Sequence, residues 1–122
     1  MAMQNPYQTY QRNSVATSSP QELTLMLYNG CLKFIRMAAI AMKKGNVEGK
    51  HTNIIKAQNI LEELRATLNM DMELSQSMDS LYAFMIEQLV SANINNNIEK
   101  LQEVEELAEE FRNTWKEAME QK

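Results

Sequence analysis

The sequence is poor in the residues that turn or cross-link a polypeptide chain. Its 122 residues include only 3 glycines, 2 prolines and one cysteine, Cys31. Such sparse turn-forming residues favour a small number of long helices over many short strands. A single cysteine excludes an internal disulfide, and the apolar neighbours of Cys31 indicate a small core residue rather than a reactive thiol.

The motifs of common catalytic and phosphate-binding sites are also missing. There is no glycine-rich phosphate loop, no GxSxG and no CxxC. His51 is the only histidine, so Glu48-x-x-His51 supplies half of the di-iron motif, which a helical bundle needs twice. Cys31 and His51 make a poor nucleophile pair because an apolar setting disfavours the thiolate. We expect a protein that is not an enzyme and that holds no cofactor and no metal.

Long hydrophobic runs are absent as well. No stretch of about 18 uncharged apolar residues occurs, because Lys33 and Arg36 interrupt the longest candidate. The N-terminus lacks a basic start followed by an apolar run, so no signal peptide is expected. These features predict a cytoplasmic protein that does not insert into a membrane.

Charge is unevenly distributed. Residues 1–98 hold 8 acids and 8 bases, whereas residues 99–122 hold 8 acids and 4 bases and so carry the whole formal charge of −4. This pattern is typical of a solvated acidic face on the last helix. The main basic cluster consists of four lysines, Lys43, Lys44, Lys50 and Lys56. No aromatic residue interleaves with them, so nucleic-acid binding is not expected.

Helix start and stop signals divide the chain into four segments. They predict helices over about residues 20–44, 47–68, 72–92 and 97–120. Ser19 and Glu22 can form a capping box at the first start. Gly45 supplies a left-handed end and Asn46 the next N-cap, while Asn96 is expected to cap the last helix.

Apolar residues recur three and four positions apart within these segments. In the second helix the stripe is Ile54, Ala57, Leu61, Leu64 and Leu68. Stripes of this kind with short connections predict an all-α, antiparallel up-down-up-down four-helix bundle over residues 19–122.

The first predicted helix is more apolar than a bundle requires. At 100° per residue its apolar arc spans about 240°, whereas a core-facing helix needs little more than about 100°. One shoulder of that arc is expected to stay uncovered and to bind another apolar helix. It carries Leu25, Tyr28, Leu32 and Ile35. Two alternatives remain open: this helix is simply the most buried one, or a homodimer covers the shoulder.

Residues 1–18 are predicted to form a segment of their own, because they are mostly polar and show no helical stripe. Tyr7 and Tyr10 are the two large aromatic residues in this segment. A disordered terminus is one interpretation, and an extended arm that lays its tyrosines over an apolar groove is the other. Ordering residues 5–10 costs about 1–2 kcal/mol each. Burying two rings returns roughly 1.5–3 kcal/mol apiece, so such an arm would be a weakly held lid.

Several motifs in order resemble those of the flagellin-specific export chaperones, the FliS family. They are Asn5-Pro6-Tyr7-x-x-Tyr10, Thr17-x-Ser19-Pro20-x-Glu22-Leu23, Leu27-Tyr28-x-Gly30, Leu81-Tyr82-x-Phe84-Met85, Leu89-x-x-Ala92-Asn93, Glu103-Val104-x-x-Leu107, Phe111-Arg112 and Trp115. The similarity spans residues 5–119. Gln88 departs from the pattern, since relatives often carry a basic residue there.

The resemblance implies a chaperone that binds the C-terminal helical segment of flagellin, prevents its premature polymerisation and delivers it to the flagellar type III export apparatus. It also implies contact with a membrane protein of the export gate and, in some bacteria, with a second flagellin-binding regulator. In the family the client folds around the bundle and displaces the N-terminal segment.

Joining the resemblance to the apolar pattern, we predict nine client-binding residues: Tyr7, Tyr10, Leu25, Tyr28, Leu32, Ile35, Tyr82, Ile86 and Leu89. The alternative function is a homodimeric structural or adaptor bundle without a flagellin client.

Overall fold

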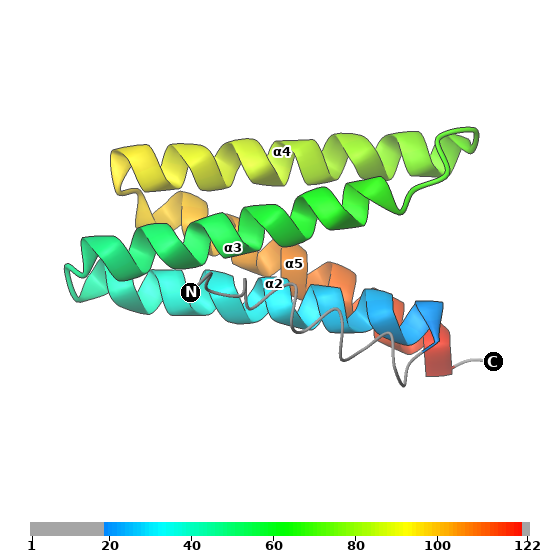
Figure 1. Ribbon diagram of the computed structural model, residues 1–122, viewed down its shortest axis with the longest axis horizontal. Coiled ribbons are helices and arrows are strands. Elements are labelled where there is room, and N and C mark those ends of the chain that lie inside the picture. The colour runs from blue at the N-terminus through cyan, green and yellow to red at the C-terminus, as the bar shows by residue number, and fades with distance from the viewer. Residues whose placement is uncertain (1–18, 121–122) are drawn as a thin grey trace, which may run out of the picture.

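The computed structural model describes residues 19–120, which fold into four α-helices. These are α2 (Pro20–Lys43), α3 (Val47–Ala66), α4 (Glu73–Asn95) and α5 (Ile98–Glu120). Each helix runs antiparallel to the one before it, in up-down-up-down order (Figure 1). The all-α bundle predicted from the sequence is confirmed, and the helix bounds differ from the predicted ones by at most three residues.

Local signals set the first two helix starts as predicted. The Ser19 hydroxyl accepts a hydrogen bond from the Glu22 backbone N–H at 3.2 Å, and the Glu22 carboxylate accepts one from the Ser19 N–H at 3.0 Å. Gly45, with φ of 73°, takes the left-handed conformation after α2. Asn46 Oδ1 then accepts from the Gly49 N–H at 2.9 Å, which caps α3.

The predicted cap of the last helix was wrong by one residue. Asn96 ends α4 in the left-handed conformation, with φ of 52°. Asn97 caps α5 instead, and its Oδ1 accepts from the Lys100 backbone N–H at 3.2 Å. Asparagine tolerates the left-handed region better than most residues, so either position in this asparagine-rich run could have served.

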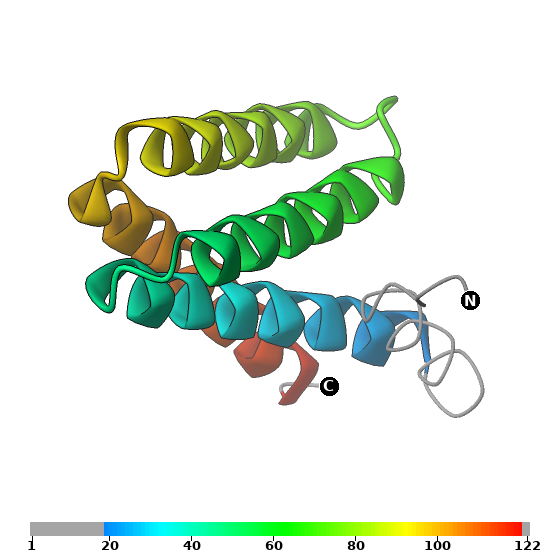
Figure 2. The same cartoon turned by 60° about the vertical axis from the view of Figure 1, so that its left-hand side comes forward.

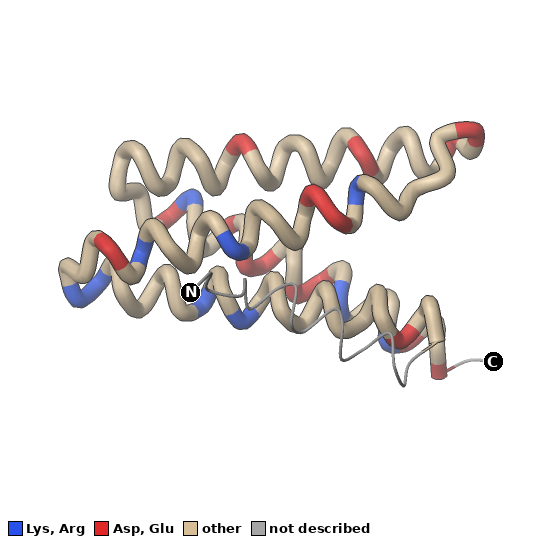
Figure 3. Tube along the Cα trace, viewed as in Figure 1, with Lys and Arg blue, Asp and Glu red and all other residues tan. Residues whose placement is uncertain are grey.

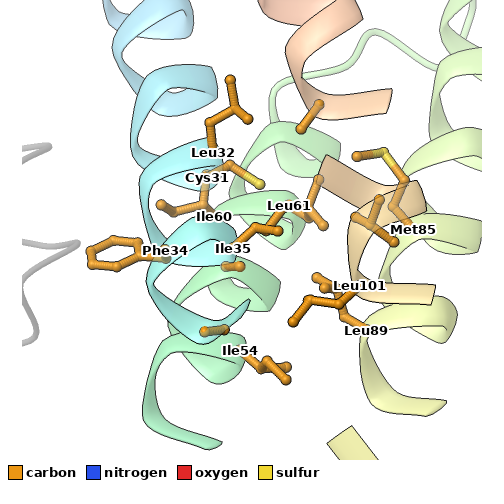
Figure 4. Close-up of a cluster of buried hydrophobic side chains, with 14 of the residues drawn as sticks. Cys31, Leu32, Phe34, Ile35, Ile54, Ile60, Leu61, Met85, Leu89 and Leu101 are labelled. Carbon is orange, nitrogen blue, oxygen red and sulfur yellow. The ribbon is translucent and has the colours of Figure 1, made fainter. Parts of the chain in front are cut away.

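Each helix packs against two neighbours: α2 and α4 both contact α3 and α5. Across the described bundle, no Cα of α2 comes within 8 Å of a Cα of α4. Side chains from all four helices fill the space between them, as Figure 4 shows. The central residues include Cys31, Leu32, Ile35, Ile54, Ile60, Leu61, Met85, Leu89 and Leu101.

The fully buried side chains lie toward one end of the bundle. Its buried side chains span residues 27–42, 50–64, 82–92 and 101–108. The α2–α3 and α4–α5 connections lie at this closed end (Figure 1). At the opposite, open end lie the longer α3–α4 connection, the start of α2 and the end of α5. Figure 2 shows α3 crossing from α2 toward α4 as it approaches the open end.

Lys50 fastens the closed end. Its side chain is only 7% exposed, and Nζ donates to the Asn93 carbonyl at 3.0 Å and to Asn96 Oδ1 at 3.2 Å. A cation is favoured here because the last carbonyls of a helix carry partial negative charge. This hydrogen-bonded lysine ties the start of α3 to the end of α4.

The predicted uncovered shoulder of the first helix is mostly absent. Tyr28, Leu32 and Ile35 are 5%, 1% and 0% exposed, because α3 and α5 flank α2 on both sides. The structure fits the alternative interpretation of the sequence, in which this helix is apolar because it is the most buried one. Among the described helices, α2 is the one long and apolar enough to cross a membrane, and 61% of that stretch is buried in the bundle.

Truncating Ile35 tests this correction. We expect Ile35→Ala to lower the free energy of unfolding by about 2–5 kcal/mol, because it leaves a cavity in the core. The matched variant Ile40→Ala removes the same atoms from a side chain on α2 that is 54% exposed. It should change the stability by less than about 0.5 kcal/mol. Urea unfolding followed by circular dichroism measures both, and equal effects would contradict the structure.

Candidate functional site

A cavity of about 690 Å³ opens between the helix ends at the open end of the bundle. All four helices contribute to its wall, and the contributions are mainly apolar. They include Leu23, Leu27, Leu68, Leu74, Met78 and Trp115. Glu63 and Glu110 are the acidic residues among the lining side chains. We call this feature the open-end cavity.

Four aromatic rings form the boundary between this cavity and the core; we call them the aromatic floor. Tyr28 lies 6.4 Å from both Phe111 and Trp115, and Tyr82 meets Phe111 edge-on at 6.2 Å, measured between ring centroids. These separations fall in the range preferred by aromatic pairs. The Trp115 indole N–H donates to the Gln21 carbonyl at 2.9 Å, which joins the end of α5 to the start of α2.

The two tyrosines share a buried hydrogen bond between their hydroxyls. Burial raises the pKa of Tyr28 above its ordinary value. Burial also raises the pKa of Tyr82, and the hydrogen bond that it shares with Tyr28 adds to that shift. Both hydroxyls are therefore neutral at physiological pH, and the floor of the cavity carries no charge.

Exposed apolar side chains are more numerous on α4 than on α2. Leu74, Phe84 and Ile94 are 69%, 48% and 77% exposed. The helix carries three acids and no lysine or arginine (Figure 3). Of these residues Leu74 also lines the open-end cavity, so the exposed apolar surface adjoins the cavity at the start of α4.

The predicted client-binding residues fall into different environments. Tyr7 and Tyr10 lie outside the described residues. Leu32, Ile35 and Leu89 are 1%, 0% and 0% exposed, so they present no surface to a client in the bundle as folded here, and their role in client binding stays a prediction. Leu25 and Ile86 are half-buried. Tyr28 and Tyr82 are the two that the structure brings together at the cavity.

Several cavity residues did not emerge from the sequence analysis as site residues. They are Leu68, which had been placed on the core stripe of the second helix, and Leu74, Met78, Phe111 and Trp115. One signal could have found them. All five are apolar residues that lie toward the open end, outside the buried stretches 54–64, 82–92 and 101–108.

No group of three or more histidine, cysteine, aspartate or glutamate side chains gathers for metal binding within residues 19–120. His51 is exposed, and its Nδ1 is hydrogen-bonded to the Asn93 side-chain amide at 2.9 Å. Cys31 lies in the core, as predicted, and burial raises the pKa of its thiol to about 12. The structure is therefore that of a four-helix bundle with a mainly apolar cavity at its open end.

Comparison with known proteins places the bundle in a family. The sequence model of the family flagellar protein FliS matches residues 3–122. The flagellar secretion chaperone FliS of Bacillus subtilis (strain 168) is 56% identical over 119 residues, covering 98% of this chain and 90% of that one. The corresponding protein of Escherichia coli (strain K12) is 34% identical over 110 residues, covering 88% and 81%.

The fold is shared with a solved bacterial flagellar chaperone. The two structures superpose with a TM-score of 0.77 over 95% of this chain and 96% of that one, at 21% sequence identity. The chain belongs to the FliS family of flagellar secretion chaperones. The resemblance seen in the motifs is thereby confirmed, and the family is one of chaperones, not of enzymes.

The reactivity of Cys31 tests the burial of the core beneath the cavity. A thiol whose pKa is about 12 is almost wholly protonated at about pH 8. We expect an aromatic disulfide reagent to leave the native protein unmodified and to modify it fully in denaturant. Reaction of the native protein at the rate of a small free thiol would contradict the buried position.

An ion pair holds the wall of the cavity together. Arg65 of α3 binds Asp79 of α4 through two bonds, Nε to Oδ1 at 2.8 Å and Nη2 to Oδ2 at 3.3 Å. The hydrogen bonds from Arg65 lower the pKa of the Asp79 carboxyl. The stabilisation is therefore present above the unfolded-state pKa of about 3.9 and is lost as the pH falls through the lowered folded-state pKa.

Asp79→Asn should accordingly lower the urea midpoint at pH 7, and the difference from the unmodified protein should vanish at about pH 2. Glu87→Gln is the control, because it removes one negative charge from an exposed site on the same helix. It should leave the midpoint nearly unchanged at both pH values. A difference for Asp79→Asn that persists at low pH would show that the carboxylate charge is not its cause.

Proposed function

We propose that this chain is a cytoplasmic export chaperone that binds the C-terminal helical segment of flagellin, prevents its premature polymerisation and delivers it to the flagellar type III export apparatus. Family membership supports the export-chaperone role. The observation that carries the proposal further is the open-end cavity together with the exposed apolar face of α4.

The dimensions suit a helical client. A volume of about 690 Å³ lies within the range of about 300–1,000 Å³ typical of ligand pockets. It is large enough for several apolar side chains but not for a folded domain. At 100° per residue Leu74, Leu81 and Phe84 lie within about 80° of one another around α4, and they extend over about 15 Å at 1.5 Å per residue, which gives a client helix an apolar strip beside the cavity.

The free energy of client binding requires contacts both in the open-end cavity and along α4. Ordering an unstructured client segment costs about 2–5 kcal/mol or more. Burying an exposed leucine or phenylalanine returns roughly 1.5–3 kcal/mol. Filling the cavity with one or two client side chains would barely offset the ordering cost. Contacts along α4, at Leu74, Leu81 and Phe84, supply the remaining stabilisation.

Further partners belong to the same proposal. The family resemblance supports contact with a membrane protein of the export gate and, in some bacteria, with a second flagellin-binding regulator. Tyr7 and Tyr10 as a lid over the apolar groove remain a prediction, and so does client binding by Leu25 and Ile86. Nucleic acid is not among the proposed partners.

A second candidate is a homodimer in which two exposed α4 faces cover each other. Leu74, Phe84 and Ile94 would favour it, since apolar patches on soluble proteins often mark an interface. Sedimentation at low micromolar concentration distinguishes the client-binding chaperone from the homodimer. A client-binding chaperone sediments as a monomer without client, whereas an obligate dimer persists.

Binding to flagellin tests the proposal directly. Isothermal titration should show binding of full-length flagellin and none of flagellin truncated at its C-terminus. Far-UV helicity of the mixture should exceed the sum of the parts, because the client segment folds on binding. Leu74→Asp should weaken binding at least about tenfold by placing a charge in the apolar contact.

The control is Ile40→Asp, which places the same charge at an exposed position of α2 that does not line the cavity. It should retain the affinity of the unmodified protein. Equal binding of full-length and truncated flagellin would contradict the assigned client segment. Equal losses for both aspartate variants would contradict the assigned surface.

A further inference from the structure

We infer that the paired hydroxyls of Tyr28 and Tyr82 form a polar anchor in the aromatic floor, which selects a client helix carrying a hydrogen-bond-accepting side chain within its apolar face. This inference rests on the proposed function, because the segment that enters the cavity is taken to be the client's. It adds the chemistry that this segment must present, which the apolar lining by itself does not define.

One hydroxyl proton of the Tyr28–Tyr82 pair has no recorded acceptor among the described residues. Each tyrosine hydroxyl has one proton to donate. Tyr28 and Tyr82 share a single hydrogen bond, so one of the two protons is spent and the other is not. Whichever way that bond runs, one O–H remains among the described residues without a recorded acceptor. Both residues line the cavity and are only 5% and 3% exposed.

The other donors around the cavity are already engaged or lie near solvent. Trp115 Nε1 donates to the Gln21 carbonyl at 2.9 Å. The hydroxyls of Thr24 and Thr67 donate to carbonyls within their own helices, at 3.1 Å and 2.7 Å. Ser75 and Thr114 are half-buried and exposed, respectively. The deep donor available to a ligand is therefore the tyrosine pair.

An occupied cavity makes this donor selective. A client side chain that fills the floor displaces solvent, and the unspent O–H must then meet an acceptor or stay unpaired in an apolar site. A purely apolar insert leaves it unpaired, so a site built around a hydroxyl rejects such an insert. Selection comes from the penalty on the wrong client as much as from the bond to the right one.

The acceptor is a neutral side chain, namely asparagine, glutamine, serine or threonine. Backbone carbonyls inside a client helix are engaged in their own hydrogen bonds and offer little. A carboxylate would be costly to bury in an apolar site, and Glu63 and Glu110 in the cavity lining would repel it. The raised pKa values of both tyrosines keep the donor protonated across the physiological range.

The double variant Tyr28→Phe/Tyr82→Phe tests the inference, because it keeps the rings and removes both hydroxyls. Replacing both partners of a buried hydrogen bond by apolar groups of the same shape is nearly neutral for folding. We therefore expect an unchanged urea midpoint but an affinity for the flagellin C-terminal segment that is weaker by about 5- to 100-fold in isothermal titration. Ser80→Ala, which deletes a hydroxyl donating to Gln76 outside the cavity, should keep the affinity.

A scan of the client completes the test. Each asparagine, glutamine, serine and threonine of the flagellin segment is replaced by alanine and titrated against both chaperones. One position should weaken binding to the unmodified chaperone and have no effect with the double variant, which is the signature of a direct pair. The inference is overturned if the double variant binds as tightly as the unmodified protein, or if no position shows this coupling. If the unmodified chaperone does not bind the segment at all, the result contradicts the proposed function itself, and the inference falls with it.

Discussion

The burial of α2 on both flanks is the constraint on which the rest of the structure depends. With α3 on one side and α5 on the other, α2 meets α4 only through the side chains between them. The distance across the bundle is therefore set by side-chain size. At the closed end these are small, such as Ala38 of α2 and Ala92 of α4. Toward the open end they are Tyr28 of α2 and Tyr82 of α4, whose large side chains meet through their hydroxyls.

This gradient explains why the cavity sits where it does. Close packing is reached where small and branched residues interlock, from Ile54 to Leu101 (Figure 4). Beyond the aromatic floor the helices diverge, and their apolar stripes continue without facing side chains to fill the space. The exposed Leu74 and half-buried Leu68 are the ends of such stripes. A cavity is then the direct result of helices that are longer than the core they enclose.

The part of the structure that the sequence could predict is the part that local chemistry decides. The capping box of Ser19 and Glu22 and the left-handed Gly45 depend only on residues a few positions away. The role of Asn96 was missed because its Oδ1 accepts a hydrogen bond from Lys50 of another helix, a contact that the neighbouring residues do not reveal. The shoulder of α2 was missed for a related reason. The width of an apolar arc says how much must be buried, not how many neighbours cover it.

The two ends of the bundle differ in how firmly they are held. At the closed end a buried lysine donates to the end of α4, and breaking that contact would strand a charge. Toward the open end, α3 and α4 are joined by the more exposed ion pair Arg65–Asp79. Ion pairs near solvent contribute little to stability. Local opening is therefore easier at the open end, where the proposed client-binding cavity lies.

That difference bears on how the site can be both tolerant and selective. Methionine is flexible and polarizable, so Met78 in the cavity wall and Met72 at the start of α4 can adapt to several apolar shapes. If the open-end cavity had only adaptable apolar walls, it would accept any apolar helix, including segments that should not be exported. A neutral donor fixed by two packed rings at the bottom of such a cavity resists adaptation, because its position is set by Phe111 and Trp115. Tolerance at the wall and a fixed requirement at the floor are compatible, since they act on different atoms of the same client helix.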